Sequence, residues 1–182
     1  MNRRQLLQLP LACGLVALLG AHTPYGQWVV YRRKHLLIGC HRRDPRTYEL
    51  AGQAVALLDE HLPDASARIA RAPDARRIAS LIGTDQIEVA VLGRAEAAAM
   101  AEGSGAFAPY GPIGLRFLAP VRDRLLVSRA AFPNRHAWLV TGALLGTVLA
   151  PLWVEWSDDL LPWHPGSEAF LQGRAAPPEP AG

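Results

Sequence analysis

Lysine and cysteine are scarce in this 182-residue chain. Lys34 is the only lysine, so arginine supplies nearly all of the positive charge. Cys13 and Cys40 are the only cysteines, and Cys13 lies in a segment that an exported chain would lose on processing. A lone Cys40 cannot form an intramolecular disulfide, so the sequence predicts a fold held by its apolar core alone.

Positive charge is also scarce beyond the first quarter of the chain. Residues 1–46 carry eight basic side chains and one acidic one, whereas the rest carries eleven basic and fifteen acidic side chains. A nucleic-acid-binding protein needs a basic face through its fold, together with stacking aromatic residues. The sequence therefore argues against a nucleic-acid partner.

The N-terminus "MNRRQLLQLPLACGLVALLG" has a short cationic start followed by an apolar run. This pattern is typical of an export signal, and both the Sec and the twin-arginine routes fit it. If the segment is retained, the uncharged span from Gln5 to Tyr31 is long enough to cross a bilayer. We therefore expect residues 1–34 to be a signal peptide or a signal anchor. The protein is expected in the periplasm, either free or anchored to the inner membrane.

From His35 onward, short β-like runs alternate with helical runs, which predicts an α/β domain over residues 35–173 with a mostly parallel sheet flanked by helices. In the first expected helix, over 47–62, apolar residues at helical spacing define the face toward the sheet: Tyr48, Ala51, Val55, Leu58 and Leu62. Two close strands are expected at 115–121 and 124–129, and a helix over 132–149. The uncharged run 137–154 is expected to be buried in the fold, with membrane contact as the alternative. Residues 174–182 are rich in proline and alanine and are expected to be disordered.

Catalytic and metal-binding patterns are missing. "EGSGAF" lacks the spacing of a nucleophile elbow. The six histidines form no i, i+4 pair and have no nearby cysteine ligands, which argues against a metal site. Asp158 and Asp159 are adjacent in the sequence, so their side chains are expected to point apart and to be solvated, which argues against a general acid/base pair. His164, in "WHPGS", is interpreted as a structural turn residue. We expect no enzyme activity, no metal and no cofactor.

The turns that follow the parallel strands hold the candidate site. In an open parallel sheet, ligands bind beyond the carboxyl ends of the strands. The turns over 41–48, 72–74 and 92–94 reach that edge, and their ligand-binding candidates are His41, Arg42, Arg43, Arg46, Thr47, Tyr48, Ala72, Asp74 and Gly93.

Arginines beside a helix N-terminus attract anions, because the helix dipole and the unpaired N–H groups also favour negative charge. Asp74 is expected to cap the helix that begins at Ala75. The alternative for the arginines is that Asp44 and the carboxylates of the first helix neutralise them on a solvated surface.

Several segments, in this order, resemble the TAXI-type extracytoplasmic receptors of TRAP transporters: "LLIGC", "RTYELAGQAVALLDEHLP", "ASLIGTDQIEVAVL", "LRFLAPV", "LLVSR", "FPNRHAWLVTGALL" and "PWHPGSEAFLQG". The resemblance implies one lobe of a type II periplasmic-binding fold. Such receptors carry a second lobe between the crossing strands and the late helix, but here "SRAAFPNRH" passes directly from one to the other. The family's opening glycines are replaced by "HRRDPRT", which keeps only Thr47 and Tyr48 of that motif.

The resemblance implies a binding module that recognises a small anionic solute, such as a dicarboxylate or an acidic amino acid, or that docks on membrane transporter subunits. The alternative is a non-catalytic accessory protein that has lost ligand binding and contacts another periplasmic protein. Self-association into a homo-oligomer is a further expectation.

Overall fold

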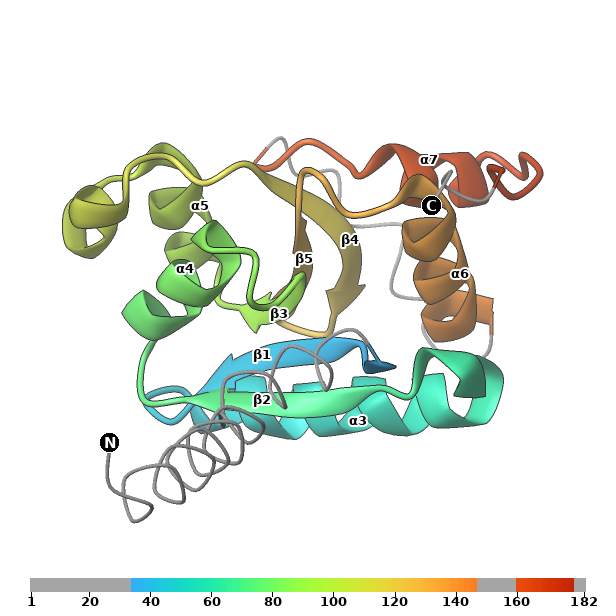
Figure 1. Ribbon diagram of the computed structural model, residues 1–182, viewed down its shortest axis with the longest axis horizontal. Coiled ribbons are helices and arrows are strands. Elements are labelled where there is room, and N and C mark those ends of the chain that lie inside the picture. The colour runs from blue at the N-terminus through green and yellow to red at the C-terminus, as the bar shows by residue number, and fades with distance from the viewer. Residues whose placement is uncertain (1–33, 147–159, 179–182) are drawn as a thin grey trace, which may run out of the picture. The chain divides into compact units, whose positions relative to one another are not determined.

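The computed structural model describes residues 34–146 and 160–178. The chain divides between Lys34 and His35, and the described fold is that of the second unit. It is an α/β domain with a five-stranded mixed sheet flanked by helices (Figure 1). The expected α/β class is confirmed. The predicted signal or anchor segment lies almost wholly outside the described residues.

The sheet has the strand order β2-β1-β3-β5-β4. Strands β1 (Leu37–His41), β2 (Arg68–Ala72) and β3 (Val89–Leu92) are parallel, whereas β5 (Arg124–Arg129) is antiparallel to both β3 and β4 (Leu115–Val121). A two-residue turn joins β4 to β5, which is too short for a crossover and therefore requires a hairpin. The expectation of a mostly parallel sheet thus holds for three adjacent strands, and the pairings of β5 make the sheet mixed.

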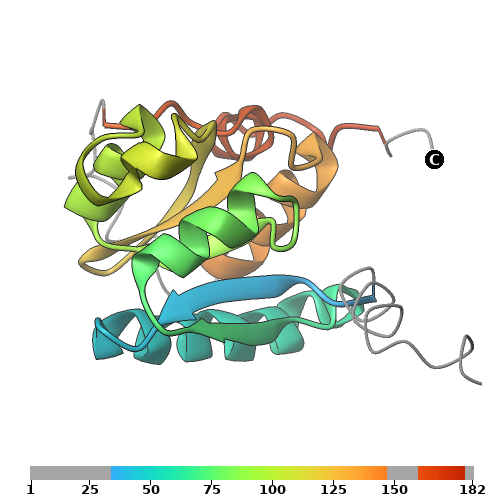
Figure 2. The same ribbon diagram turned by 60° about the vertical axis from the view of Figure 1, so that its left-hand side comes forward.

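The helices lie on both faces of the sheet. Helix α3 (Pro45–His61) packs on one face, and α4 (Ala75–Gly83) and α5 (Arg94–Glu102) pack on the other (Figure 2). The chain moves from β1 outward to β2 and then returns past β1 to β3. Because crossovers are right-handed, these two opposite movements place α3 and α4 on opposite faces.

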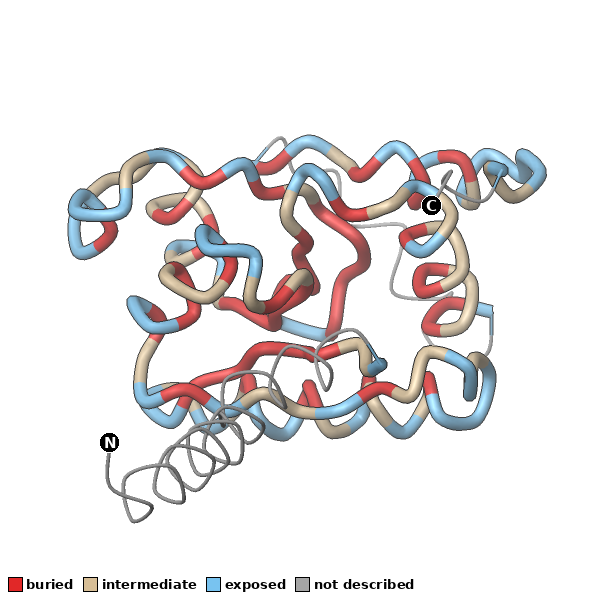
Figure 3. The backbone as a smooth tube through the Cα atoms, in the orientation of Figure 1, coloured by how far each residue is buried: buried red, intermediate tan, exposed pale blue. Residues whose placement is uncertain are grey.

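Two apolar layers form the core, one on each face of the sheet. The buried residues are concentrated along β1, β3, β4 and β5 (Figure 3). Side chains alternate along β1, so that Ile38 and Cys40 belong to the layer under α3 while Leu37 faces α4. Gly39 also faces α4, where an added Cβ would lie 2.6 Å from Cδ1 of Ile87. Burial raises the pKa of the Cys40 thiol to about 11, so this cysteine is a core residue with little thiolate at neutral pH.

The buried face of α3 differs in part from the predicted one. Its buried residues are Thr47, Leu50, Ala51, Ala54 and Leu58. Tyr48 is 43% exposed, and its ring lies 4.6 Å from the guanidinium carbon of Arg71 on β2. The prediction that Tyr48 packs on the sheet is therefore wrong, because the polar Thr47 takes the inward position for the hydrogen bonds that it makes to the preceding turn.

Helices α6 (Asn134–Leu144) and α7 (Pro165–Leu171) pack against each other beside the sheet (Figure 1). Residues 147–159, which hold the end of the helix expected over 132–149 and the pair Asp158 and Asp159, lie outside the described residues. In the described part of the chain, no helix combines the length and apolarity that a membrane span needs. Residues 174–178 are described too, and the carbonyls of Arg174 and Pro177 accept hydrogen bonds from Trp138 and Arg135.

His164 caps helix α7, as the interpretation of a structural turn residue requires. Its Nδ1 atom accepts a hydrogen bond from the backbone N–H of Gly166 at 3.1 Å, while its Nε2 atom lies 2.8 Å from the carbonyl oxygen of Phe132. An added Cβ on Gly166 would overlap the carbonyl group of Asn134, so only glycine lets the two helices approach this closely. Burial lowers the pKa of His164.

This lowered pKa predicts a pH dependence of stability. The folded-state pKa lies below the unfolded value of about 6.5, so protonation favours the unfolded chain. The stabilisation is complete above pH 6.5 and is lost as the pH falls from there through the folded-state pKa. Melting temperatures of the full chain between pH 7.5 and 5.0 should fall more steeply for the wild type than for His164→Asn, whose capping amide does not titrate. The exposed His61→Asn is the control and should follow the wild type, and equal slopes for wild type and His164→Asn would contradict the prediction.

Candidate functional site

The turn between β1 and α3 is held by the Thr47 side chain. Its hydroxyl donates to the carbonyl oxygen of Asp44 at 2.7 Å and accepts from the backbone N–H of His41 at 3.2 Å. Thr47 is completely buried. A predicted ligand donor is thus a residue that fixes where β1 ends and α3 begins, and its hydroxyl is engaged within the turn.

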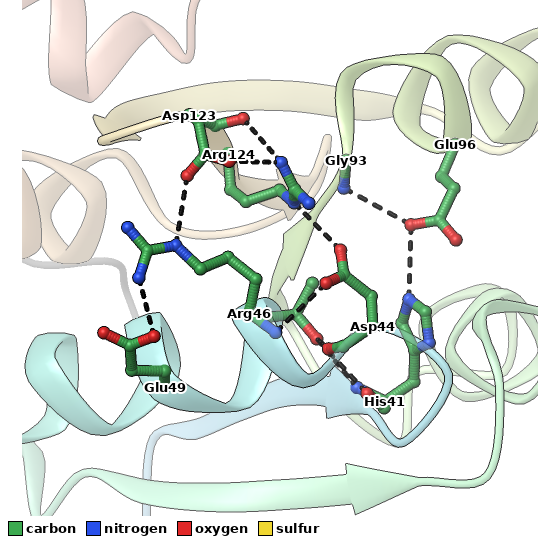
Figure 4. Close-up of polar contacts among 9 residues, drawn as sticks. His41, Asp44, Arg46, Glu49, Gly93, Glu96, Asp123 and Arg124 are labelled. Carbon is green, nitrogen blue, oxygen red and sulfur yellow. Dashed lines mark hydrogen bonds and ion pairs between the residues drawn. The ribbon is translucent and has the colours of Figure 1, made fainter.

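Asp44 connects this turn to the β4–β5 hairpin (Figure 4). Its Oδ1 atom accepts from the backbone N–H of Arg46 at 3.0 Å, which caps α3, and its Oδ2 atom accepts from Nε of Arg124 at 2.9 Å. Both side chains of the Asp44–Arg124 pair are less than a quarter exposed. The hydrogen bond to Asp44 raises the pKa of Arg124, so the charge of this guanidinium is permanent.

Arg46 is paired with carboxylates on both sides. It donates to Glu49 at 2.6 Å from Nη1 and to Asp123 at 3.4 Å from Nε. The hydrogen bonds to Glu49 and Asp123 raise the pKa of Arg46. For Arg46, the geometry agrees with the alternative given above, that carboxylates neutralise the arginines. One carboxylate comes from the first helix and the other from the hairpin turn.

A hollow of about 360 Å³ opens on the other side of the turn, between the end of β1 and the starts of α4 and α5. Its lining combines charged side chains with apolar ones: His41, Arg43, Asp74, Ala75, Arg76, Glu96, Ala106 and Phe107. The crossovers that leave β1 and β3 go to opposite faces of the sheet at this point, which is where ligands bind in open α/β sheets.

The floor of the hollow contains an ordered pair, His41 and Glu96. Nε2 of His41 lies 3.2 Å from Oε2 of Glu96, and the same oxygen accepts from the backbone N–H of Gly93 at 3.3 Å. An ionised carboxylate only accepts, so Nε2 of His41 is the donor in this contact. His41 is 1% exposed, and within the described residues its Nδ1 atom has no hydrogen-bond partner. An unmade hydrogen bond at a buried site costs about 1–3 kcal/mol.

The rim of the hollow carries two arginines with loosely held side chains. Arg43 is 73% exposed and lies 4.0 Å from Asp74, while Arg76 is 55% exposed and lies 3.5 Å from the same carboxylate. Asp74 caps α4 through the backbone N–H of Arg77 at 3.0 Å, as predicted. This backbone hydrogen bond, reinforced by Arg76 and Arg43, lowers the pKa of Asp74.

The structure brings three of the nine predicted site residues together in the hollow, namely His41, Arg43 and Asp74. Gly93 is at its margin through the bond to Glu96. Ala72 is buried at the end of β2, where its carbonyl oxygen accepts from the N–H of Arg42 at 3.0 Å. The remaining side chains, those of Arg42, Arg46, Thr47 and Tyr48, do not line the hollow.

The sequence-based prediction missed Glu96, Arg76 and Phe107. Glu96 had a signal, because a glutamate three residues after the N-cap Gly93 is the spacing with which a side chain reaches back to the cap. Phe107 comes from the 3-10 helix Gly105–Tyr110, in a segment whose many glycines and prolines give no helical period. Arg124 pairs with Asp44 across 80 positions, for which local sequence holds no signal.

Comparison with known proteins finds no family model and no curated protein that matches the chain. Among the described residues, no group of three or more His, Cys, Asp or Glu side chains could hold a metal ion.

The Asp44–Arg124 pair should contribute measurably to stability. Asp44→Asn keeps a good N-cap residue but removes the charge, so a double-mutant cycle with Arg124→Ala isolates the ion pair. We expect a coupling of about 0.5–1 kcal/mol in the free energy of unfolding by urea, the upper part of the range for pairs near a surface. The exposed pair Asp59–Arg68, at 3.6 Å, serves as control and should couple by close to zero. Equal coupling in the two cycles would contradict this assignment.

Proposed function

We propose that this chain is an exported, non-catalytic binding module that holds a small anionic solute in the hollow lined by His41 and Glu96. It would be a short form of the TAXI-type receptors that lacks most of the second lobe. The observation that carries the proposal is the position of the hollow, at the carboxyl edge of the strands where the crossovers from β1 and β3 diverge.

The charges around the hollow support an anion. Asp74 and Glu96 are engaged by the backbone N–H groups of Arg77 and Gly93, so each carboxylate already has a donor. The side chains of Arg43 and Arg76 lie at the rim, and each has more than half of its surface exposed to solvent. Their guanidinium groups can turn toward a ligand carboxylate, for which their planar fork geometry is suited.

The size of the hollow favours a small ligand. At about 360 Å³ it is at the lower end of the range of roughly 300–1,000 Å³ for ligand sites. A dicarboxylate or an acidic amino acid fits that scale. Because the described domain supplies one wall of the site, we expect weak binding.

A second candidate is an accessory protein that contacts a membrane transporter subunit or another periplasmic protein. The pairing of Arg46 with Glu49 and Asp123 favours this second candidate. These two carboxylates neutralise the positive charge beside the N-terminus of α3, so that it does not attract a ligand. In this case anions would have no effect, and the edge of the sheet would be a protein-binding surface.

Thermal unfolding of the full chain with succinate and aspartate separates the two candidates. A ligand at ten times its Kd stabilises the folded chain by about 1.4 kcal/mol, which corresponds to roughly 3–6 °C in Tm. Arg43→Ala and Arg76→Ala should each reduce this shift to less than half.

Adjacent arginines outside the hollow provide matched controls. Arg42→Ala and Arg77→Ala remove exposed positive charges from positions next to Arg43 and Arg76, and both should keep the shift. A shift lost in all four variants would indicate a general charge effect and would contradict a site in the hollow. No shift with either anion in the wild type would favour the accessory protein.

A further inference from the structure

The hollow has an apolar wall beside its charged rim. Ala75 at the start of α4, together with Ala106 and Phe107 of the 3-10 helix, forms this wall. Most of the surface that lines the hollow is apolar. Sites for small molecules have this composition, in which a few polar groups orient the ligand and apolar side chains cover the rest of it. A ligand with a charged group at each end would place one of those groups against the apolar wall.

The rim has the positive charge for one ligand carboxylate. Arg43 and Arg76 both contact the carboxylate of Asp74, at 4.0 and 3.5 Å. A backbone hydrogen bond from Arg77 lowers the pKa of Asp74, so this carboxylate is ionised and takes up one of the two positive charges. The other positive charge is matched by a single carboxylate of a ligand, which the guanidinium forks can bind.

Beyond the rim, the lining offers no counter-charge for a second carboxylate. The other ionisable side chains of the lining are His41 and Glu96. Nε2 of His41 lies 3.2 Å from Oε2 of Glu96 (Figure 4), so these two groups are paired with each other. Whether or not His41 is protonated, the pair has no net positive charge. A second carboxylate would therefore lose water at the apolar wall without gaining a partner, which is costly for a charged group.

We propose that the hollow selects small monocarboxylates with an uncharged apolar body over dicarboxylates of the same length. The ligand carboxylate lies at the rim with Arg43 and Arg76, and the apolar body covers the wall formed by Ala75, Ala106 and Phe107. This inference rests on the proposed function, because it names the small anions that the same hollow binds most tightly. The size of the hollow admits both kinds of ligand, and its wall distinguishes between them.

Butyrate and succinate test the proposal, because succinate is butyrate with the terminal methyl group replaced by a carboxylate. Titrations of the full chain at pH 7.5, followed by NMR so that weak binding is measured, should give butyrate a Kd at least about fourfold below that of succinate. From acetate through propionate to butyrate, each added CH2 group should lower the Kd by about twofold. Complete burial of a CH2 group would give about fourfold.

A lysine placed on the wall should reverse the preference. Ala106 is exposed and lines the hollow, so Ala106→Lys supplies a counter-charge for the second carboxylate, and succinate should then bind more tightly than butyrate. Ala108→Lys is the matched control, because Ala108 is exposed in the same 3-10 helix and does not line the hollow. This control should keep the wild-type order. A preference for succinate in both lysine variants would indicate a general charge effect and would overturn the assignment to the wall.

The wild-type titrations decide the matter if Ala106→Lys does not fold. Equal Kd values for butyrate and succinate, or tighter binding of succinate, would overturn the selectivity while the proposed function stands. Absence of saturable binding by both ligands would overturn the selectivity and the proposed function together.

Discussion

The arrangement of the turns at the carboxyl edge of the sheet depends on the position of the Asp44 carboxylate. One of its oxygens caps α3 and the other holds Arg124 at the start of β5. Strand β3 lies between β1 and β5 in the sheet, so this single side chain connects two segments that no backbone pairing joins. Thr47 completes the arrangement, because its hydroxyl fixes the distance between the last residue of β1 and the first turn of α3. The position of His41 at the floor of the hollow follows from these two contacts.

The same edge is divided into two electrostatic environments. On the α3 side, Arg46 and Arg124 are matched by Asp44, Glu49 and Asp123, so little free charge remains there. On the α4 and α5 side, Asp74 and Glu96 are held by backbone N–H groups, and the arginines that also contact Asp74 are mostly exposed to solvent. A charged side chain is thus available to a ligand when its partner of opposite charge is held by other groups. The number of charged residues in the turn does not show this.

Much of the fold could be predicted from the sequence, since the strands and helices up to residue 129 have strong periodic patterns and clear turn residues. The cap at Asp74 followed from its place before Ala75. Helix α7 was not predicted, because its seven residues are too few for a helical period to stand out. The antiparallel pairing of β5 with β3 is set by long-range packing, which local pattern does not report.

The candidate site was only partly predictable, for a related physical reason. Residues after a strand end can be placed at an edge from sequence, as His41, Arg43 and Asp74 were. Which of them turn into the hollow depends on partners far along the chain. Thr47 is used by the turn itself, and Arg46 is drawn toward Asp123 from the hairpin. Glu96 enters because its reach back to Gly93 also brings it to His41.

The hollow leaves its rim charges in contact with water. Arg43 and Arg76 are solvated, so their attraction for an anion is weakened by the high dielectric constant of water and by the side-chain entropy lost when they are ordered. Rim charges of this kind attract many anions alike. The floor is different, because His41 is excluded from water and is held by Glu96. In the proposed function the rim therefore supplies the attraction for the anion, and the His41–Glu96 pair fixes the surface beneath it.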